Sequence, residues 1–316
     1  MNESHSSDAN GFFVYLQFKS NQVKIALYGK RFDQEFTDSI EKLFDSLVRR
    51  GIGILVHEKF YLFLSQKVTL PSTVEIFRTT EDLQQVSYLL SVGGDGTLLE
   101  TAALIRDTRI PVLGINTGRL GFLSPVSGND IDMAIEALVN KDYTIDKRSL
   151  IEVRSEQQDF GDFPYALNDV TLTNKQRSSM ITIHAYINDQ FMNTYWADGL
   201  IVATPTGSTA YSLSCGGPII MPESNNVILT PIAPHNLNVR PFVMPNSSKV
   251  SLRAEGREPH FTLTLDSRSF VVDNETIIDL TRANFELYMI SLPGMGFFNT
   301  IRQKMGWGHD ARTKPR

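Results

Sequence analysis

In the first half of the chain, apolar residues follow two spacings that alternate along the sequence. Four short, almost continuous apolar runs are typical of buried strands: Val23–Tyr28, Ile52–Val56, Tyr88–Val92 and Val112–Ile115. Three further segments have helical character: Glu35–Arg49, Thr97–Ile105 and Ile131–Leu138. In the first of these, Phe36, Ile40, Leu43 and Leu47 lie three or four residues apart and share one helical face. Strands that alternate with helices in this way predict a parallel sheet covered by helices.

From about Ile145 onward the pattern changes to short runs that are typical of strands. Eight such runs are found: Leu150–Val153, Met180–Ile187, Phe191–Trp196, Leu200–Ala203, Lys249–Arg253, Phe261–Leu265, Thr276–Leu280 and Phe285–Ile290. Between them lie Asn-Asp, Asp-Ser and Asp-Asn pairs, which favour turns. We therefore expect an α/β N-terminal domain with a parallel sheet and helices, followed by a mainly antiparallel all-β C-terminal domain.

The change of pattern also predicts domain limits. We expect residues 1–20 to be a loose leader, 21–145 the α/β domain and 146–290 the β-rich domain. Residues 291–316 form a C-terminal segment in which Phe297–Trp307 has a helical pattern, and we expect it to return to the first domain.

Composition and charge exclude several classes of protein. The 316 residues carry 41% hydrophobic and 21% charged residues, as a globular protein does. The net charge is −5 and no run of Lys or Arg exceeds two residues, so we expect no nucleic-acid partner. Cys215 is the single cysteine, which excludes an internal disulfide. No apolar run reaches the roughly 20 residues that cross a bilayer, and the polar N-terminus has no signal-peptide pattern. We therefore expect a cytoplasmic protein without a membrane partner.

The segment Gly93-Gly94-Asp95-Gly96-Thr97 follows an apolar run and precedes a helical one. Glycines let the backbone approach a ligand closely, and the first N–H groups of the next helix favour an anion. A carboxylate beside phosphates would serve as a Mg²⁺ contact or as the proton acceptor for an attacking hydroxyl. An ordinary strand-to-helix turn is the competing interpretation. The sequence contains no G-x-x-x-x-G-K-[ST] motif, so a P-loop enzyme is excluded.

A second glycine-rich segment, Asn116–Phe122, follows the next predicted strand. Two neighbouring strands that both end in such loops form a crevice at the carboxyl edge of a parallel sheet. Arg119 supplies a charge for phosphate or is simply solvated. Phe122 stacks on a base or belongs to the core.

Two segments of the second half complete the candidate chemistry. In Thr204–Tyr211, a buried strand runs into a turn of small hydroxylated residues, which suits a neutral sugar or an amide. Asn168 and Asp169 are adjacent, and adjacent side chains reach one ligand only near a bulge or a strand end. Each segment taken alone is equally typical of a turn or loop.

Taken in their order along the chain, these four segments closely resemble the NAD kinase family. The resemblance continues through Leu229–His235 and Arg240-Pro241 and covers about Val23 to Trp307. The Gly-Gly-Asp-Gly element is shared with lipid kinases and phosphofructokinases, whereas Thr-Pro-Thr-Gly-Ser-Thr-Ala-Tyr is highly specific. The family usually has glutamate where this chain has Asp169, whose side chain is one methylene shorter.

The resemblance implies a two-domain kinase whose NAD site lies between the domains and is completed by a neighbouring subunit. It implies Asp95 as the catalytic base and these NAD-binding residues: Gly96, Phe122, Asn168, Asp169, Asp198, Thr209, Ala210, Tyr211 and Ala233. Asp198 is expected to reach the NAD of the partner subunit. We expect four residues of the glycine-rich loops to bind the phosphates of ATP: Gly93, Gly94, Thr97 and Arg119.

The implied reaction transfers a phosphoryl group from ATP to the 2′-hydroxyl of the adenosine ribose of NAD and gives NADP and ADP. The cofactor is Mg²⁺ or another divalent cation that arrives with ATP, because no cluster of metal ligands is visible. A homodimer or homotetramer is expected. Two alternatives stay open: a diacylglycerol- or sphingosine-type lipid kinase, and a non-catalytic dinucleotide-binding protein.

Overall fold

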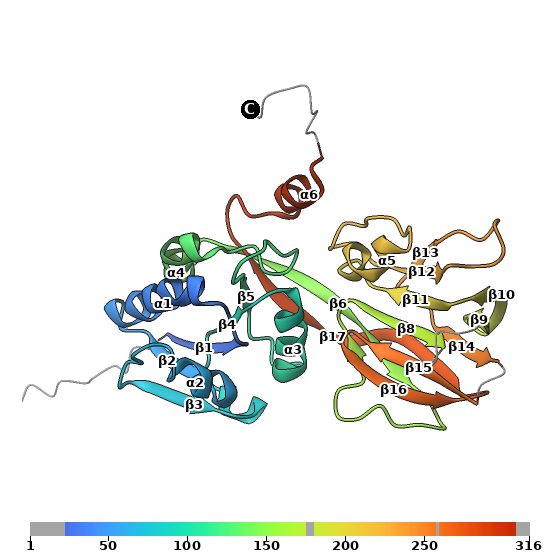
Figure 1. The fold of residues 1–316 in the computed structure, drawn as a ribbon, viewed down its shortest axis with the longest axis horizontal. Coiled ribbons are helices and arrows are strands. Elements are labelled where there is room, and N and C mark those ends of the chain that lie inside the picture. The colour runs from blue at the N-terminus through green and yellow to red at the C-terminus, as the bar shows by residue number, and fades with distance from the viewer. Residues whose placement is uncertain (1–22, 175–179, 257–258, 308–316) are drawn as a thin grey trace, which may run out of the picture.

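A computed structural model describes residues 23–174, 180–256 and 259–307, and Figure 1 shows two domains joined by long strands. The predicted leader, residues 1–20, lies outside the described residues. Of the described helices, none is long and apolar enough to span a membrane.

The first domain contains a parallel sheet in the order β3-β2-β1-β4-β5. Its strands are β1 (Lys24–Gly29), β2 (Gly53–His57), β3 (Val74–Phe77), β4 (Tyr88–Val92) and β5 (Val112–Ile115). Its helices are α1 (Thr37–Arg49), α2 (Glu58–Leu64), α3 (Asp95–Ile105) and α4 (Ile131–Asn140). Every residue of β4 is buried, which is why this strand is a mostly apolar run in the sequence; the buried Ser91 hydroxyl accepts a bond from Thr101 at 3.0 Å.

The two faces of this sheet are covered by different helices. On one face, Ile25, Leu27 and their neighbours pack with buried residues of α1, α2 and α4. On the other face, Ala26 and Leu89 pack with Leu98 and other residues of α3. The parallel sheet between helices that the sequence predicts is therefore confirmed.

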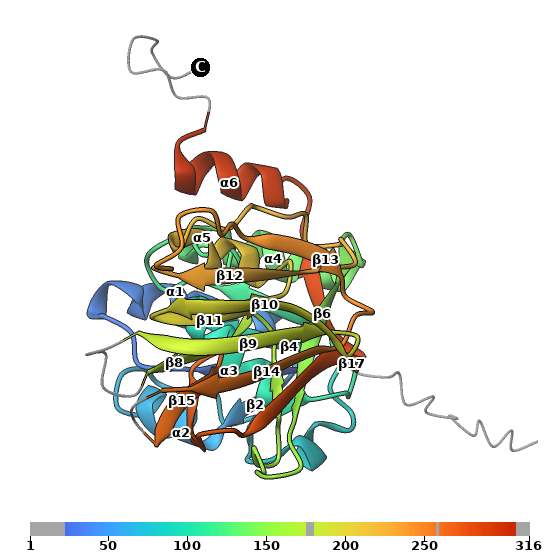
Figure 2. The same ribbon diagram turned by 90° about the vertical axis from the view of Figure 1, so that its right-hand side faces the viewer.

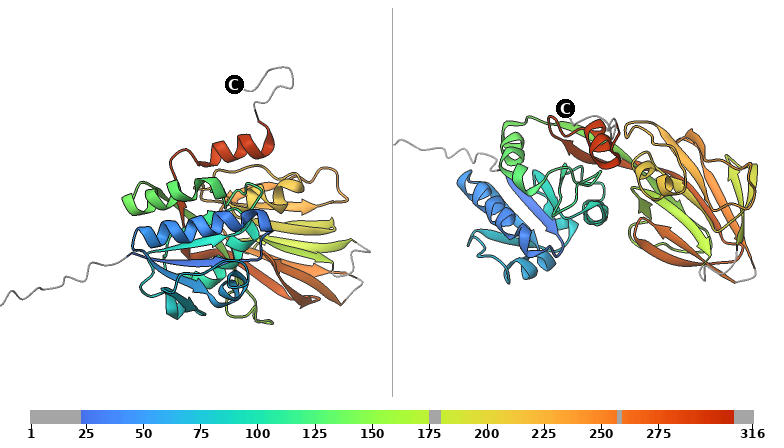
Figure 3. Two further views of the ribbon diagram at one scale, coloured as in Figure 1. Left: turned by 60° about the vertical axis from the view of Figure 1, so that its left-hand side comes forward. Right: turned by 45° about the horizontal axis from the view of Figure 1, so that its top comes forward.

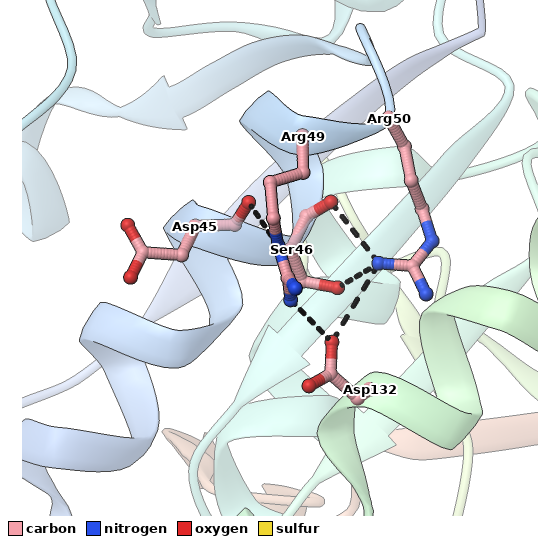
Figure 4. A network of polar contacts seen from close by, with 5 residues as sticks. All are labelled: Asp45, Ser46, Arg49, Arg50 and Asp132. Carbon is pink, nitrogen blue, oxygen red and sulfur yellow. Dashed lines mark hydrogen bonds and ion pairs between the residues drawn. The ribbon is translucent and has the colours of Figure 1, made fainter.

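Polar contacts link α1 to α4 at the surface (Figure 4). Arg49 donates to Asp132 at 3.2 Å, and Arg50 lies 3.6 Å from the same carboxylate. Arg50 also donates to the Ser46 hydroxyl at 2.6 Å. Because Asp132 and Arg49 are exposed, solvent screens these charges and the pairs contribute little to stability. The buried apolar faces are the main attachment of both helices.

Two long strands carry the chain between the domains, as the right-hand view of Figure 3 shows. They are β6 (Thr144–Arg154) and β17 (Ile277–Ser291), which pair antiparallel with a register shift between Arg282 and Glu286. Near its end, Met289 of β17 pairs in parallel with Val112 of β5. The return to the first domain is thus made by β17 itself, before residue 291 where the sequence places it. The two predicted strands Thr276–Leu280 and Phe285–Ile290 are one bulged strand.

The second domain is a sandwich of two sheets (Figure 2). One sheet continues from β17 through β14 (Val250–Glu255) and β9 (Ile181–Ile187) to β10 (Gln190–Ala197). The other has the order β13-β12-β11-β8-β15-β16 and is antiparallel. Its strands are β8 (Asp169–Asn174), β11 (Gly199–Ala203), β12 (Asn226–Ile232), β13 (Phe242–Pro245), β15 (His260–Leu265) and β16 (Arg268–Asp273). The short β7 (Tyr165–Ala166) pairs with β6. The antiparallel all-β domain is confirmed.

The six-stranded sheet has one apolar and one mixed face, because side chains alternate along each strand. Val170 and Leu172 of β8 belong to the core between the two sheets. Their neighbours Asp169, Thr171 and Thr173 therefore point to the opposite face. Part of that face is covered by the short helix α5 (Tyr211–Ser214), and the C-terminal helix α6 (Phe297–Met305) follows β17.

Candidate functional site

The glycine loop between β4 and α3 is built for close approach. Gly93 donates to the Ile115 carbonyl at 2.8 Å, which ties this loop to the end of β5. A Cβ atom at Gly93 would lie 2.2 Å from Thr97 Oγ1, so only glycine fits there. Cβ atoms at Gly94 and Gly96 would meet no atom within 4 Å. The backbone on both sides of Asp95 therefore has open space in front of it for a ligand.

Asp95 is the first residue of α3, and its carboxylate holds the next loop. It accepts three backbone N–H bonds, from Phe122 at 2.9 Å, Leu123 at 2.9 Å and Ser124 at 3.2 Å. A carboxylate offers about four lone-pair positions, so about one is left for a further donor. The catalytic role of Asp95 stays a prediction; the structure shows that its carboxylate joins the two glycine-rich loops.

A cavity of about 580 Å³ lies on the mixed face of the six-stranded sheet and against α3. Its lining is mostly polar and contains no Lys or Arg; it consists of Leu99, Asn168, Asp169, Thr171, Thr173, Asn174, Asp198, Ala210, Tyr211, Ile232, Thr264 and Asp266. Five of these were predicted as NAD-binding residues: Asn168, Asp169, Asp198, Ala210 and Tyr211. We call this space the sheet cavity. The structure thus brings together five of the predicted NAD-binding residues, although the first and the last of them, Asn168 and Tyr211, are 43 positions apart in the sequence.

Asn168 and Asp169 lie at a strand end, the position at which neighbouring side chains can reach one ligand. Asp169 is the first residue of β8 and Asn168 precedes it. Thr204 fixes this segment: its N–H donates to the Asn168 carbonyl at 2.9 Å, and its hydroxyl donates to the Leu167 carbonyl at 2.6 Å. A Cβ atom at Gly207 would lie 2.0 Å from the same Asn168 carbonyl oxygen. These contacts are a physical reason for Thr and Gly in the Thr-Pro-Thr-Gly segment.

Two polar groups at this strand end are poorly satisfied within the protein. Asn168 Oδ1 is buried and has no hydrogen-bond partner among the described residues. Asp169 is 7% exposed and accepts one bond at 3.0 Å from the Thr171 hydroxyl. Burial, together with the nearby charge of Asp266, raises the pKa of Asp169 to about 7. An orphaned buried amide oxygen costs free energy unless a donor from a ligand or water meets it.

The turn that follows β11 presents Ala210 and Tyr211 to the sheet cavity. It is anchored from the first domain's side by Arg148 of β6, which pairs with Asp146 and donates to Thr206 Oγ1 at 3.4 Å. The Thr209 hydroxyl bonds back to the Thr206 carbonyl at 3.2 Å and is not part of the lining. Ala233 has a positive φ of 44° and follows Ile232, which lines the cavity.

Asp198 and Tyr211 line the same cavity of one chain. The pairing of Ala203 with Asp169 and of Gly199 with Thr173 places Asp198 at the far end of β8 from Asp169. The cavity runs along that strand between them. The separation of Asp198 and Tyr211 along the sequence therefore does not by itself require a second subunit. That two subunits share the site stays a prediction.

A second cavity, of about 940 Å³, opens at the carboxyl ends of β1 and β2. We call it the strand-end cavity. Four cationic residues line it: Lys30, Arg31, Lys59 and Lys67. Sequence reasoning missed it, although Lys30-Arg31 directly follows a predicted strand, the position where ligands bind in α/β folds. Its one acidic lining residue, Glu100, pairs with Lys30 at 2.5 Å and accepts a bond from the Tyr28 hydroxyl at 2.8 Å.

Helix α3 separates the two cavities. Leu99 lines the sheet cavity and Glu100 lines the strand-end cavity. Because residues four apart share a helical face, Asp95 lies on the side of Leu99, and Gly96 on the side of Glu100. The open glycine turn at the start of α3 therefore lies between the sheet cavity and the strand-end cavity.

Phe122 and Arg119 occupy other positions. The Phe122 ring lies 6.4 Å from that of Phe297 on α6, and Lys304 Nζ lies 4.8 Å above it. Arg119 is exposed, and within the described residues it makes no ion pair. Neither residue lines the two cavities, so their predicted contacts with adenosine and phosphate stay predictions.

Comparisons with known proteins agree along the chain. Residues 25–143 match the family model of the ATP-NAD kinase N-terminal domain, and residues 167–292 that of the ATP-NAD kinase C-terminal domain. The NAD kinase of Cytophaga hutchinsonii is 43% identical over 288 residues, which are 91% of this chain and 99% of that protein. The NAD kinase of Flavobacterium psychrophilum is 42% identical over 92% of this chain and 100% of its own.

Two solved structures share the fold. A yeast NADH kinase complexed with NADH superimposes with a TM-score of 0.81 at 23% identity, over 93% of this chain and 90% of its own. An NAD kinase from Archaeoglobus fulgidus in complex with ATP gives a TM-score of 0.67 at 24% identity, over 90% of this chain and 98% of its own. Both therefore support the two-domain architecture.

Proposed function

The chain belongs to the NAD kinase family, and from that premise we propose that it transfers the γ-phosphoryl group of ATP to the 2′-hydroxyl of the adenosine ribose of NAD. The sheet cavity binds NAD, and the strand-end cavity binds ATP with its Mg²⁺. The observation that carries the proposal is the unpartnered Asn168 Oδ1 beside the buried Asp169 in a cavity that begins next to the glycine loop.

The charges of the two cavities support this division. Three aspartates line the sheet cavity: Asp169, Asp198 and Asp266. Carboxylates and threonine hydroxyls accept bonds from ribose hydroxyls and amide N–H groups, and the charges of the carboxylates repel phosphates. The four cations of the strand-end cavity suit a triphosphate. The phosphates of NAD and ATP are thereby directed away from the acidic cavity and toward the glycine turn.

The glycine turn of α3 then receives the reacting groups. The open space at Gly94 and Gly96 and the N-terminal end of the helix suit phosphate oxygens. In the transfer, a bond forms between the ribose 2′-oxygen and the γ-phosphorus, and the bond from that phosphorus to the β,γ-bridging oxygen breaks. ADP leaves, and the hydroxyl proton passes to the remaining acceptor position of Asp95. Positioning and charge neutralisation contribute more than proton removal, because phosphoryl-transfer transition states are loose. Mg²⁺ enters with ATP as part of the substrate.

Three further properties of the molecule are part of the proposal. We infer a homo-oligomer, a cytoplasmic location and a requirement for a divalent cation. They follow from the resemblance to the NAD kinase family and from the phosphates of the substrates.

The direct test incubates the pure protein with Mg-ATP and NAD and measures NADP with an NADP-specific dehydrogenase. Two variants separate the cavities. Asn168→Ala is expected to raise KM for NAD about 10-fold or more with little change in KM for ATP, and Lys59→Ala is expected to do the reverse. Lys42→Ala, an exposed lysine on α1, is the control. Binding of NAD without NADP formation would leave a dinucleotide-binding protein, and no binding of NAD would refute the proposal.

A further inference from the structure

We propose that Asp266, in the turn between β15 and β16, and Arg268, the first residue of β16, are positioning residues that hold Asn168 and Asp169 in place for the dinucleotide. This inference rests on the proposed function in one respect: the ligand of the sheet cavity is NAD. The sequence marks Asp266 only as part of an Asp-Ser turn pair, and Arg268 belongs to no motif that it singles out. Asp266 lies 97 positions from Asp169 in the sequence, so only the paired strands β8 and β15 bring them together.

Asp266 binds three consecutive N–H groups of the segment that carries the site. Its carboxylate accepts bonds from Leu167 at 2.9 Å, Asn168 at 2.8 Å and Asp169 at 3.2 Å. In return, the N–H of Asp266 donates to the Asp169 carbonyl at 3.0 Å. Together with the two bonds from Thr204, every N–H and C=O group of these three residues has a partner. The backbone below Asn168 and Asp169 is therefore fully fixed.

Arg268 binds the preceding part of the same segment, and it donates hydrogen bonds where Asp266 accepts them. Its guanidinium donates to the carbonyls of Phe163 and Tyr165. It also lies 5.1 Å above the Phe163 ring, a cation–π contact. One turn thus binds residues 163–169 through acceptors at one end and donors at the other, which determines both the position and the direction of the segment.

The turn between β15 and β16 is tight and places Asp266 at a positive φ. Leu265 pairs with Arg268, so only Asp266 and Ser267 form the turn, and Asp266 has a φ of 53°. Aspartate is one of the few non-glycine residues that adopt positive φ with little strain. Glycine would serve the turn alone, but it would leave three N–H groups of the site segment without their acceptor.

The position of Asp266 also affects the chemistry of Asp169. The negative charge of Asp266 is one cause of the raised pKa of Asp169, after burial. Burial raises the pKa of Asp266 itself, whereas its three backbone N–H bonds and the nearby charge of Arg268 oppose that rise. Cys215, which follows α5, also lies near Asp169. Removal of the Asp266 charge is therefore expected to lower the pKa of Asp169.

The decisive variant is Asp266→Asn, because asparagine tolerates positive φ but carries one acceptor oxygen and two donors. We expect KM for NAD to rise about 10- to 100-fold, the effect of losing charge-assisted bonds, while KM for ATP stays within about twofold. We also expect the inflection of kcat/KM for NAD that belongs to Asp169 to move to lower pH. A purely structural turn would not move this inflection.

Asp189→Asn is the matched control. Asp189 also has a positive φ, of 64°, in the turn between β9 and β10, but it is exposed and lies away from the sheet cavity. We expect its KM values and pH profile to equal those of the wild type.

If folded Asp266→Asn has the KM for NAD and the pH profile of the wild type, the inference is overturned. If Asp266→Asn does not fold, Arg268→Lys decides: one ammonium replaces a guanidinium that serves two carbonyls, and we expect KM for NAD to rise severalfold. An unchanged KM in that variant would equally overturn the inference. Failure of the wild type to form NADP would refute the proposed function instead, so the two failures are distinguishable.

Discussion

The carboxylate of Asp95 lies in the space that a side chain at Gly121 would need. A Cβ atom at Gly121 would come within 1.9 Å of Asp95 Oδ1. The same carboxylate accepts the N–H groups of the three residues that follow Gly121. Glycine at position 121 therefore leaves the space that the Asp95 carboxylate occupies. The two loops are thereby bonded to each other at the start of α3.

Gly121→Ala is expected to displace the Asp95 carboxylate without removing it. We expect kcat to fall by about 10²-fold or more, the lower range for loss of a positioned proton acceptor. Gly118→Ala is the control from the same loop, because a Cβ atom there would meet no atom within 4 Å. Steady-state kinetics of both variants, with circular dichroism to confirm folding, checks this. A near-normal kcat in folded Gly121→Ala would contradict a role for the position of Asp95.

Asn168→Ala is expected to weaken the binding of NAD more than it affects folding. The Oδ1 atom has no partner in the part of the chain that the structure describes, so its removal breaks no hydrogen bond to that atom there. We expect binding to weaken by roughly 1–3 kcal/mol in titration calorimetry. Asn116→Ala is the contrast: its amide donates to the carbonyls of Ser124 and Val126 at 3.2 and 3.0 Å, so it should lower the melting temperature. A melting temperature lowered equally in both variants would indicate a structural role for Asn168.

The raised pKa of Asp169 predicts a pH dependence of stability. Its pKa is about 7 in the folded protein and near 3.8 in the unfolded chain. Between these values the unfolded chain ionises this group while the folded protein keeps it protonated, so the folded state loses stability as the pH rises. The stability of Asp169→Asn relative to the wild type should therefore increase from about pH 4 to pH 7 and then level off.

Thermal unfolding at a series of pH values measures this difference. Asp142→Asn, at an exposed position after α4, is the control and should show a difference that does not follow that window. A constant difference for Asp169→Asn between pH 4 and pH 8 would show that Asp169 is ionised in the folded protein like an exposed aspartate.

The divalent cation is expected to bind with ATP and not as a resident ion. Within residues 23–174, 180–256 and 259–307, no group of three or more His, Cys, Asp or Glu side chains is arranged to hold a metal. Activity should be lost on chelation and return fully when Mg²⁺ is added. Metal analysis after dialysis against EDTA tests this, and a stoichiometric ion retained without ATP would contradict it.

Asp198 offers a test of the predicted oligomer. If Asp198 completes the site of a neighbouring subunit, mixing Asp198→Ala with Asp95→Asn should restore part of the activity, because one site of a mixed dimer would have both residues intact. Asp198 and Tyr211 also line one cavity of a single chain, so Asp198 could instead serve the site of its own chain. No recovery, with mixed oligomers proven by mass spectrometry, would assign Asp198 to the site of its own chain.

The sequence by itself determined the features that depend on local order. The strands β4 and β5 lie where the apolar runs place them, because strands buried on both faces are almost entirely apolar; Ser91 is the one polar side chain of β4 besides the Tyr88 hydroxyl. The change from helical to strand-like spacing indicated two kinds of domain. The glycine-rich segments indicated the loops at the carboxyl edge of the sheet, because glycine is the residue that allows a tight turn and close approach of the backbone to its neighbours.

Tertiary structure decided the features that depend on pairing between distant strands. Helix α2 was missed because Tyr61, Leu62 and Phe63 follow one another without helical spacing. The acceptor of the Asn168 N–H comes from Asp266, 98 positions later, and the donor to its carbonyl comes from Thr204. Likewise, Lys30 and Lys59 face one cavity only because β1 and β2 are parallel neighbours. Periodicity reports which face of an element is buried, whereas strand register and side-chain packing set which residues meet, and these are properties of the whole fold.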